Sequence, residues 1–332
     1  MTEVKPTILV TGGAGYIGSH AVLALKRAGY GIIVLDNLEY GHREFVEDIL
    51  KVELVVGDIG DRLLLDKVFA TRNIAAVMHF AAYIAVGESV SDPAKYYRNN
   101  VSGMLTLLEA MVAADVKQVV FASTCSIFGE PKQVPMTEDH PQDPINPYAA
   151  TKWMGERMLA DFDSAYGLQS VVFRFFNACG ANPEGLIGED HTPETHLIPL
   201  VLLTALGKRA SISIYGTDYD TPDGTCLRDY IHVSDLANAY VLGVEYLLEG
   251  GKSEVFNLGN GNGFSVREVI ETAKQVTGRD FKVVECDRRS GDPSILVGSS
   301  EKAHKILGWS PKYPDISQII SHAWQWHQRR HQ

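Results

Sequence analysis

Tyr148 and Lys152 are the residues whose types and spacing suggest proton transfer most directly. Asn146 is a plausible helix cap and Pro147 a favoured first helical residue, so the two side chains are expected on one helix face, four residues apart. A free tyrosine has a pKa of about 10, which is too high for a base at neutral pH. An ammonium group beside the phenol and a second nearby cation would favour the phenolate, and lowering the pKa by about three units requires about 4 kcal/mol. The pair is therefore predicted to accept and return a proton, although the same spacing also occurs on surface helices.

Thr124 is the next candidate, because it follows a predicted buried strand (118–123) that ends in Ser123. Doubly wound parallel sheets bind ligands in the crevice at the carboxyl ends of their strands, so both hydroxyl groups are expected there. The Thr124 hydroxyl can donate or accept a hydrogen bond at a substrate oxygen and help to transfer the proton. With Tyr148 and Lys152, it predicts chemistry on an alcohol carbon; a simple turn residue is the alternative.

A glycine-rich run, Gly12-Gly13-Ala14-Gly15-Tyr16-Ile17-Gly18, lies between a predicted strand (7–11) and a predicted helix (17–28). It fits both the GxGxxG pattern and its spaced variant GxxGxxG. Glycines permit a tight turn and a close approach of the backbone to a pyrophosphate, and the N–H groups of the helix N-terminus attract the phosphates. The run predicts a dinucleotide-binding turn, in preference to an ordinary turn, with contacts from Gly12, Gly15, Tyr16, Ile17 and Gly18.

The carboxylate of Asp36 identifies the expected dinucleotide more closely. Asp36 ends the second predicted strand, about 20 residues beyond the glycines, where an acid can accept both ribose hydroxyls. It would repel a 2′-phosphate, and Asn37 rather than an arginine follows it, so NAD is favoured over NADP. Asp58 and Ile59, at the end of the third predicted strand, are expected at the adenine. A helix cap or a surface acid is the alternative for each aspartate.

The elements that must position these residues alternate regularly in the first half of the chain. Continuous apolar runs predict strands covered on both faces, and the segments between them have helical periodicity. This alternation predicts an α/β fold with a Rossmann-type, doubly wound parallel sheet. The predicted strands are 7–11, 32–36, 52–58, 75–80, 118–123 and 170–175, and the predicted helices are 17–28, 61–70, 92–114 and 147–165.

The pattern changes after about Phe176, where a loop rich in Gly, Pro and Asn (177–195) begins. Helices are then predicted at 233–248, capped by Ser234, and after the capping box formed by Ser265 and Glu268. A strand at 281–285 and a closing helix at 317–331 complete the prediction. We therefore expect an NAD-binding Rossmann domain at 1–176 and a smaller, mixed α/β substrate lobe at 177–332. The boundary is approximate, and some segments after it are expected to return to the first domain.

Bulk properties exclude several classes of function. The 332 residues carry a net charge of −11, with 45% hydrophobic and 21% charged residues, which is typical of a globular protein and argues against a nucleic-acid partner. The four cysteines lack metal-ligand spacing, so no metal site is expected. They are instead expected to be free thiols in a reducing compartment. The first six residues lack an apolar signal region, and no stretch approaches the roughly 18 apolar residues of a membrane span. A cytoplasmic protein without a membrane partner is predicted.

The motifs resemble those of the extended short-chain dehydrogenase/reductase family, and among its members the nucleotide-sugar 4-epimerases most of all. The resemblance covers residues 8–324, nearly the whole chain. It rests on these stretches: 11–20, Asp36-Asn37-Leu38, His79-Phe80-Ala81-Ala82, Val86-Gly87-Glu88-Ser89, 96–100, Phe175-Phe176-Asn177, Gly188-Glu189-Asp190, 215–219, 228–233 and Arg288-Arg289-Ser290-Gly291-Asp292.

The resemblance implies a reaction at C4 of a UDP-hexose, the interconversion of UDP-galactose and UDP-glucose. Tightly bound NAD would take the C4 hydride while the Tyr148 phenolate, held by Lys152 and assisted by Thr124, takes the hydroxyl proton. The 4-keto sugar would turn over and receive the hydride on its other face, so the cofactor is recycled in each turnover. It also implies a homodimer, in which helices 92–114 and 147–165 pair across a two-fold axis.

The resemblance also assigns binding residues. On the substrate side it implies contacts from Asn177, His196, Leu197 and Tyr230, with Arg228 and Arg289 at the diphosphate and Asp292 at the ribose. On the cofactor side it implies contacts from Phe80, Ala81, Asn99, Ser123 and Phe175. Surface ion pairs remain the alternative for the arginines, and core packing or capping for Phe80 and Asn99.

Some positions depart from the family pattern. Ile84 stands where many relatives have a lysine near the cofactor, and His196 stands where an asparagine is usual. Thr124 replaces a common serine but keeps the hydroxyl. Leu296 falls near the position that limits bulk at the sugar's C2 substituent and does not reveal whether N-acetylhexosamines are accepted.

Three other functions are alternatives for a chain with these motifs. A nucleotide-sugar 4,6-dehydratase needs an acid and a base after Thr124, where this chain has Cys125 and Ser126. A 4-epimerase of another UDP-sugar, such as UDP-xylose, UDP-glucuronate or a UDP-N-acetylhexosamine, stays open. A non-catalytic NAD sensor is disfavoured, because Tyr148 and Lys152 are both present.

Overall fold

The computed structural model describes residues 5–289 and 292–331. Residues 1–4, Ser290, Gly291 and Gln332 lie outside the described residues, and so do the predictions made for them.

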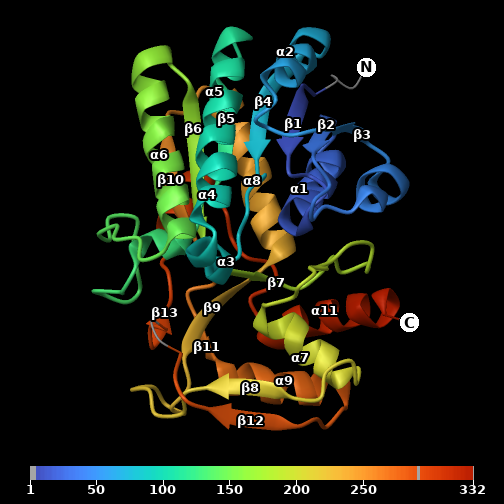
Figure 1. Ribbon diagram of the computed structural model, residues 1–332, viewed down its shortest axis with the longest axis vertical. Helices are drawn as coiled ribbons and strands as arrows, with labels where there is room; N and C mark the ends of the chain where they lie inside the picture. Colours follow the sequence, from blue (N-terminus) through green and yellow to red (C-terminus); the bar gives the residue numbers. More distant parts are fainter. Residues whose placement is uncertain (1–4, 290–291, 332) are drawn as a thin grey trace.

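A seven-stranded parallel sheet forms the centre of the larger part of the molecule (Figure 1). Every neighbouring pair of its strands is parallel. The strand order reverses between β1 and β4, which makes the carboxyl edge of these two strands the expected ligand crevice. The predicted doubly wound α/β fold is therefore confirmed. The order is β10 (Glu254–Leu258), β6 (Gln169–Phe175), β5 (Gln118–Ala122), β4 (Ile74–His79), β1 (Thr7–Thr11), β2 (Gly31–Asp36) and β3 (Glu53–Val56).

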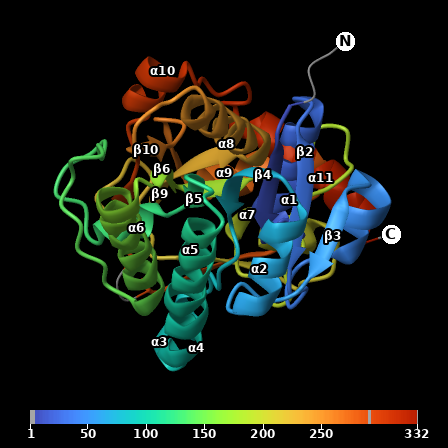
Figure 2. The ribbon, with the colours of Figure 1, turned by 90° about the horizontal axis from the view of Figure 1, so that it is seen from above.

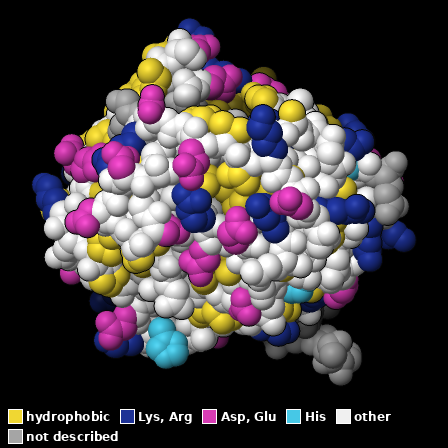
Figure 3. Space-filling model, turned by 90° about the horizontal axis from the view of Figure 1, so that it is seen from below, with side chains coloured by type: hydrophobic (Ala, Val, Ile, Leu, Met, Phe, Trp, Pro, Cys, Tyr) yellow, Lys and Arg dark blue, Asp and Glu magenta, His cyan; other side chains and the backbone are white. Residues whose placement is uncertain are grey.

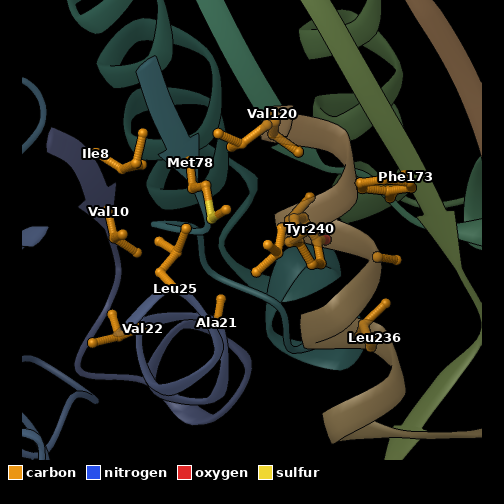
Figure 4. Packing of buried hydrophobic residues seen from close by; sticks show 14 of the residues in the cluster. Ile8, Val10, Ala21, Val22, Leu25, Met78, Val120, Phe173, Leu236 and Tyr240 are labelled. Atoms are coloured by element: carbon orange, nitrogen blue, oxygen red, sulfur yellow. The ribbon is translucent and has the colours of Figure 1, made fainter. Parts of the chain in front are cut away.

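Both faces of the sheet are covered because successive side chains of a strand point to opposite sides. Ile8 and Val10 of β1 pack against α1 (Tyr16–Arg27) and α8 (Val233–Leu248) in the cluster shown in Figure 4. Leu9 packs into a second cluster on the other face. Its helices are α2 (Arg62–Thr71), α5 (Met104–Ala113) and α6 (Pro147–Tyr166), which lie on the opposite side of the sheet from α8 (Figure 2). Burial on both faces explains why these strands are almost continuously apolar.

The elements predicted for the first half are present, and the ends of the strands shift by at most two residues. The predicted helix 92–114 consists of α4 (Pro93–Tyr96), the wider π-helical η2 (Tyr97–Gly103) and α5. Three short helical segments were not predicted: η1 (Phe45–Leu50), α3 (Val86–Ser91) and η3 (Cys125–Phe128).

The second half forms a smaller part beyond the carboxyl edge of the large sheet (Figure 1). Its strands are β7 (Asn177–Cys179), β8 (Ile212–Tyr215), β9 (Leu227–His232), β11 (Gly263–Ser265), β12 (Val283–Cys286) and β13 (Ile295–Leu296). Its helices are α7 (Leu197–Ala205), α9 (Val266–Thr277) and α11 (Ile316–Arg330).

Three segments of the second half return to the large sheet. Helix α10 (Glu301–Leu307) packs there through Ala303 and Leu307, beside α8 and β10 (Figure 2). Strand β10 pairs with β6, and α8 packs against α1 across the face of the sheet. The division of the chain at residue 176 remains a prediction.

Of the two helix caps predicted in the second half, one is present and the other is not. The capping box of α9 is confirmed, since Ser265 and Glu268 exchange both hydrogen bonds. The prediction that Ser234 caps α8 is wrong: His232 Nδ1 accepts the hydrogen bond from the Ser234 backbone N–H at 3.0 Å. Ser234 therefore already lies inside the helix, where its N–H needs an acceptor from the preceding residues.

Charged side chains of both signs are interspersed with apolar ones on the face of the smaller part seen in Figure 3. This mixed pattern differs from the basic surface that nucleic-acid binding usually requires. Among the described residues, the helices are too short or too polar to cross a membrane.

Candidate active site

The glycine-rich turn is closed on one side by the protein backbone. Gly12 has a φ of +73°, and a Cβ there would lie 2.5 Å from the Ala81 nitrogen. A Cβ on Gly18 would lie 2.1 Å from the Gly12 oxygen, so α1 can approach β1 only with glycine at this position. Gly15 is freer, since its Cβ would meet only the Gly12 oxygen at 3.4 Å.

The first backbone N–H groups of α1 are free to bind a ligand at this turn. Gly15 is the N-cap, and within the described part of the chain no side-chain cap accepts from the first-turn N–H groups and the first turn itself contains no acidic residue. Free N–H groups at a helix N-terminus bind phosphate oxygens, so the turn fits the pyrophosphate of a dinucleotide. Tyr16 instead donates its hydroxyl hydrogen to the Gly180 carbonyl at 2.8 Å, which ties the turn to the loop after β7, and Ile17 is half-buried against the first core cluster.

The carboxylates expected at adenosine lie at the ends of neighbouring strands. Asp36 ends β2 and accepts hydrogen bonds from the Ala14 and Leu38 nitrogens, both at 2.9 Å. Burial raises the pKa of this carboxyl, while the two backbone donors lower it. Asn37 donates to Asp58, just beyond β3, at 3.2 Å. Ile59 is buried in the core cluster beneath them, so the structure brings the predicted adenosine residues together.

The residues after β4 contact the same turn. The Phe80 and Ala81 nitrogens both donate to the Thr11 carbonyl, at 2.9 and 3.1 Å, and the Phe80 ring packs on Tyr240. Asn99 donates to the side chain of Asn100 at 2.8 Å.

Asn100, which the sequence did not single out, joins this loop to α6. Its buried amide donates to the Tyr83 carbonyl at 3.0 Å and to Thr151 Oγ1 at 3.1 Å, and accepts from the Tyr83 nitrogen at 2.9 Å. Two adjacent asparagines on a helix look alike in sequence, and only the packing distinguishes the buried one.

The predicted proton-transfer residues meet at the carboxyl end of β5. Asn146 caps α6 as predicted, since its Oδ1 accepts from the Ala149 nitrogen at 2.9 Å. Lys152 Nζ donates to the Ala122 carbonyl at 2.8 Å, and Thr124 is near enough to Tyr148 for its hydroxyl to lower the pKa of that phenol. All three functional side chains are buried, being 4 to 8% exposed.

Aromatic contacts join this group to the strand that leads into the glycine-rich turn. Lys152 Nζ lies 5.0 Å from the centre of the Phe121 ring, which stacks on His79 at 5.6 Å. His79 Nδ1 in turn lies 2.7 Å from Thr11 Oγ1. This chain of buried contacts links the proton-transfer group to the residue that directly precedes the glycine-rich turn.

Burial dominates the protonation of the pair. It raises the pKa of Tyr148 to about 12, against a smaller opposite effect of the Thr124 hydrogen bond. It lowers the pKa of Lys152 to about 7, although the nearby Glu156 carboxylate raises it. Burial is thus the largest effect of the protein's own groups on the Tyr148 pKa, and the lowered pKa that Lys152 and a second cation would produce together stays a prediction.

A buried ion pair lies behind Ser123 and was not predicted. The Ser123 hydroxyl donates to Glu156, whose carboxylate pairs with Arg174 at 2.7 Å. Arg174 also donates to the Glu138 carbonyl at 2.9 Å. Ser123, expected at the cofactor, thus has its hydroxyl directed into the protein and held by α6.

Cys125 cannot provide the acid or base of a dehydratase. Burial raises the pKa of its thiol to about 12. Ser126, the next residue, hydrogen-bonds to Thr124 at 3.2 Å.

The substrate-side residues come from the ends of β7 and β9 and from the loop before β13. Asn177 Nδ2 donates to the Asp229 carbonyl at 3.0 Å, and Tyr230 is buried in the core of the smaller part. Arg228 pairs with Asp292 at 3.0 Å. Arg289 stands apart from this pair, with its guanidinium 3.7 Å from the centre of the Tyr215 ring.

Asp229, another residue not singled out, organises the loops around Arg228. Its fully buried carboxylate accepts from the backbone nitrogens of Asn260, Gly261 and Gly298 at 2.6 to 3.2 Å. Burial raises its pKa to about 6 against these donors. In sequence it was one residue of the stretch 228–233 that carries the family resemblance, without a role of its own.

His196 and Leu197 lie where the loop after β7 enters α7. His196 Nδ1 lies 2.9 Å from carboxylate oxygens of both Glu189 and Glu194. Burial opposes protonation of this imidazole, but the two carboxylates prevail and raise its pKa to about 10.

Three further predicted positions have simpler surroundings. Phe175 is half-buried against the first core cluster. Leu296 packs in a small cluster with Cys125 and Phe128, and Ile84 is exposed.

Comparison with known proteins identifies the fold and site described above. Residues 8–259 match the model of the NAD dependent epimerase/dehydratase family. The chain belongs to this family.

Individual members of the epimerase/dehydratase family resemble the chain over nearly its full length. UDP-glucose 4-epimerase of Halalkalibacterium halodurans is 56% identical over 320 residues, which are 96% of this chain and 95% of that protein. The Rhizobium meliloti UDP-glucose 4-epimerase is 53% identical over 325 residues, 98% of both chains. The structure of UDP-glucose 4-epimerase from Brucella ovis in complex with NAD superposes with a TM-score of 0.94 at 47% identity, over 96% of this chain and 97% of that one.

Proposed function

We propose that this chain interconverts UDP-galactose and UDP-glucose by inverting the configuration at C4 of the hexose. The observation that carries the proposal is that the buried side chains of Tyr148, Lys152 and Thr124 lie together at the carboxyl end of β5. Phe121, His79 and Thr11 connect them to the glycine-rich turn. The relatives named above have this activity in their names.

The proposed roles follow from these contacts. Tyr148 takes the proton of the C4 hydroxyl and later returns it, and Thr124 holds the same oxygen through its hydroxyl. Lys152 lies one helical turn from Tyr148 and is fixed by the Ala122 carbonyl. NAD would supply a reversible hydride acceptor and a positive charge that favours the phenolate. The residues proposed to hold it are Gly12, Gly15, Tyr16, Ile17, Gly18, Asp36, Asn37, Asp58, Ile59, Phe80, Ala81, Asn99, Ser123 and Phe175.

The UDP moiety is proposed to bind between the two parts of the molecule. Arg228 and Arg289 would bind the diphosphate, Asp292 the ribose, and Asn177 and Tyr230 the nucleotide-sugar; fixed guanidinium groups suit diphosphate oxygens. Because both carboxylates already engage the His196 imidazole, we propose that the backbone at His196 and Leu197 faces the uridine.

An assay without added NAD tests this function. Purified protein whose bound NAD has been measured is incubated with UDP-galactose, and UDP-glucose is quantified by chromatography. We expect product; its absence from NAD-containing protein would refute the function. UDP-xylose, UDP-glucuronate and UDP-N-acetylgalactosamine in parallel reactions establish the preferred sugar.

Tyr148→Phe tests the mechanism. This variant removes only the phenolic oxygen and is expected to lower kcat by about 10²–10⁴-fold, the usual contribution of a positioned acid–base group. Tyr166→Phe, at an exposed position of the same helix, is the matched control and is expected to keep full activity. Unchanged activity of Tyr148→Phe would exclude the proposed role.

We also propose a homodimer formed by residues 92–114 (α4, η2 and α5) and by α6, and a reducing cytoplasmic location. Tyr97, Leu105 and Trp153 are 37 to 40% exposed on these helices, which supports a further apolar contact there. All four cysteines are free thiols, as expected in a reducing compartment. Light scattering is expected to give twice the chain mass for the wild type and the monomer mass for Trp153→Asp; a monomeric wild type would disprove the dimer.

A further inference from the structure

Four metal-ligating side chains converge in the loop between β7 and α7. They are Glu189, His191, Glu194 and His196, and one ligand atom from each lies within 4.8 Å of all the others. The four lie within eight consecutive residues, so the loop forms the cluster locally. None of them takes part in the proton-transfer site around Tyr148.

The distances between these atoms suit a small ion. The Nδ1 atom of His196 lies 2.9 Å from oxygens of Glu189 and Glu194, and that of His191 lies 3.3 and 3.7 Å from oxygens of the same two acids. Four ligands bound tetrahedrally at about 2.0–2.1 Å from a zinc ion would be separated by about 3.3 Å. The measured separations lie on both sides of this value.

The His191 imidazole gives an independent indication. Its Nδ1 is buried, yet it has no hydrogen-bond partner within the described part of the chain, although two carboxylates lie within 3.7 Å. An N–H group forming an ion pair would point at one of those oxygens. An unpaired nitrogen between two carboxylates has the arrangement of a ligand directed at a shared ion.

Burial adds to this argument. The Glu189 and Glu194 side chains are only 4 and 8% exposed. Two desolvated carboxylates require compensating positive charge; the His196 ion pairs provide it when no ion is bound, and a divalent cation held by the same side chains would provide it in their place. The His196 side chain is 46% exposed, which leaves a path for an ion to enter.

The cavity beside the cluster has a further buried histidine. His327 of α11 is 3% exposed, its Nδ1 has no partner among the described residues, and it lines the same cavity, of about 350 Å³, as Glu189, His191 and Glu194. Unpartnered buried nitrogens are uncommon in folded proteins, and two of them lie at this one place.

We propose that Glu189, His191, Glu194 and His196 bind one divalent zinc-like ion that fixes the loop between the two parts of the molecule. Two imidazoles with two carboxylates favour zinc over magnesium or calcium, which prefer oxygen ligands alone. Four protein ligands fill a tetrahedral shell, as in structural rather than catalytic zinc sites.

The surroundings of the loop explain what such an ion would hold together. The Glu189 carbonyl accepts from Trp326 Nε1 of α11 at 3.0 Å, and Asp190 pairs with Arg330 at 2.6 Å. The His191 ring also contacts Tyr16 of the glycine-rich turn edge-on, with ring centres 6.3 Å apart. The ion would thus join α11, the start of α7 and the start of α1.

The test measures metal in the full-length, NAD-containing protein and does not depend on epimerase activity. Wild type and variants are equilibrated with Zn²⁺, passed through a metal-free gel-filtration column and analysed for metal by mass spectrometry. Glu194→Gln removes a ligand charge but keeps an oxygen that accepts from the Thr195 and His196 nitrogens. His191→Phe keeps a ring beside Tyr16. Glu184→Gln, an exposed position in the same loop, is the matched control.

We expect one zinc per chain in the wild type and in Glu184→Gln, and less than one-tenth of that in Glu194→Gln and His191→Phe. A chelator should lower the melting temperature of the wild type but not that of Glu194→Gln. Wild type that retains no zinc, or variants that retain as much as the wild type, would overturn the proposal and leave a cluster of ion pairs.

X-ray absorption of the zinc-loaded wild type tests the ligands without any substitution. Four nitrogen or oxygen neighbours at about 2.0–2.1 Å are expected, with outer-shell scattering from two imidazole rings. A shell containing sulfur, or six oxygens, would place the ion elsewhere and contradict the proposed site. Bound NAD, measured by absorbance in every sample, confirms that each variant is folded.

Discussion

At the scale of the residue, Lys152 is the side chain of the proposed site whose charged form is most strongly disfavoured by burial. Its ammonium group is buried with the Ala122 carbonyl as hydrogen-bond acceptor, and burial lowers its pKa to about 7. The unfolded chain has no such penalty, so holding a charged Lys152 in this position reduces the stability of the fold. Strained or desolvated groups of this kind are common in sites where function competes with stability.

Lys152→Met should reveal this competition through its pH dependence. The folded pKa lies below the unfolded value of 10.5, so the destabilisation is complete below about pH 7 and decreases as the folded lysine loses its proton between pH 7 and pH 10.5. We expect the variant, stripped of NAD, to be more stable than the wild type at pH 7 by about 1–3 kcal/mol, with an unpaired Ala122 carbonyl reducing the gain.

Urea unfolding at pH 7 and pH 9 measures this effect. The advantage of Lys152→Met should shrink by about 2–3 kcal/mol at the higher pH. Lys305→Met, at an exposed lysine of α10, is the control and should show a constant difference from the wild type. An advantage of Lys152→Met that does not change with pH would show that the lysine is not desolvated.

At the scale of the element, α6 has two ion pairs of opposite kinds. Glu156 pairs with Arg174 in the interior, where the two side chains are 9 and 4% exposed. Arg157 pairs with Asp161 on the surface, where they are 72 and 61% exposed.

We expect Glu156→Gln to lower the free energy of unfolding by about 3–5 kcal/mol, because it leaves the Arg174 charge buried and unpaired. Asp161→Asn should change it by less than about 0.5 kcal/mol. Chemical denaturation checks both, and similar values for the two variants would contradict this account of α6.

Helix α1 allows a comparable test of the glycine-rich turn. A Cβ on Gly18 would collide with the Gly12 oxygen, whereas Gly29, just after α1, has open space around it and a φ of +86°. Gly18→Ala should therefore displace the turn and reduce bound NAD by more than tenfold. Gly29→Ala should keep its NAD and lose about 1–2 kcal/mol of stability through backbone strain alone. Absorbance of the released cofactor gives the result, and full NAD content in Gly18→Ala would mean that the turn is not the cofactor site.

The elements also show what could be predicted from sequence. Apart from the edge strand β3, the strands of the first half are mostly buried, so their apolar runs are clear in the sequence, and their ends located Asp36 and Thr124 correctly. Strand β10 was missed because Glu254 and Asn257 interrupt its pattern; Asn257 is buried and donates to the Met136 carbonyl at 3.1 Å. The partners of Glu156 and Asp229 come from other segments of the chain, and no local spacing reveals such contacts.

At the scale of the whole molecule, the large sheet is built from both halves of the chain. Leu236, Tyr240 and Val244 of α8 cover the same face as Val10 and Val22. A fragment of residues 1–176 would lack this cover and expose the free edge of β6, so we expect it to bind a hydrophobic dye and to unfold without cooperativity. Extending it to residue 262, which adds α8 and β10, should restore part of the cooperative transition. A cooperatively folded 1–176 fragment that holds NAD would support an independent first domain.

The return of β10 also has a consequence for protein synthesis. Ribosomes release the chain from its N-terminus, and β6 meets its outer neighbour only after β10 has been made; the Ser170 nitrogen, for example, bonds to Ser253, 83 residues later. Until then the nascent sheet has an open edge and an uncovered apolar face, the two features that most favour aggregation. Chaperone contact during translation is therefore expected to be greatest between the emergence of β6 and that of β10.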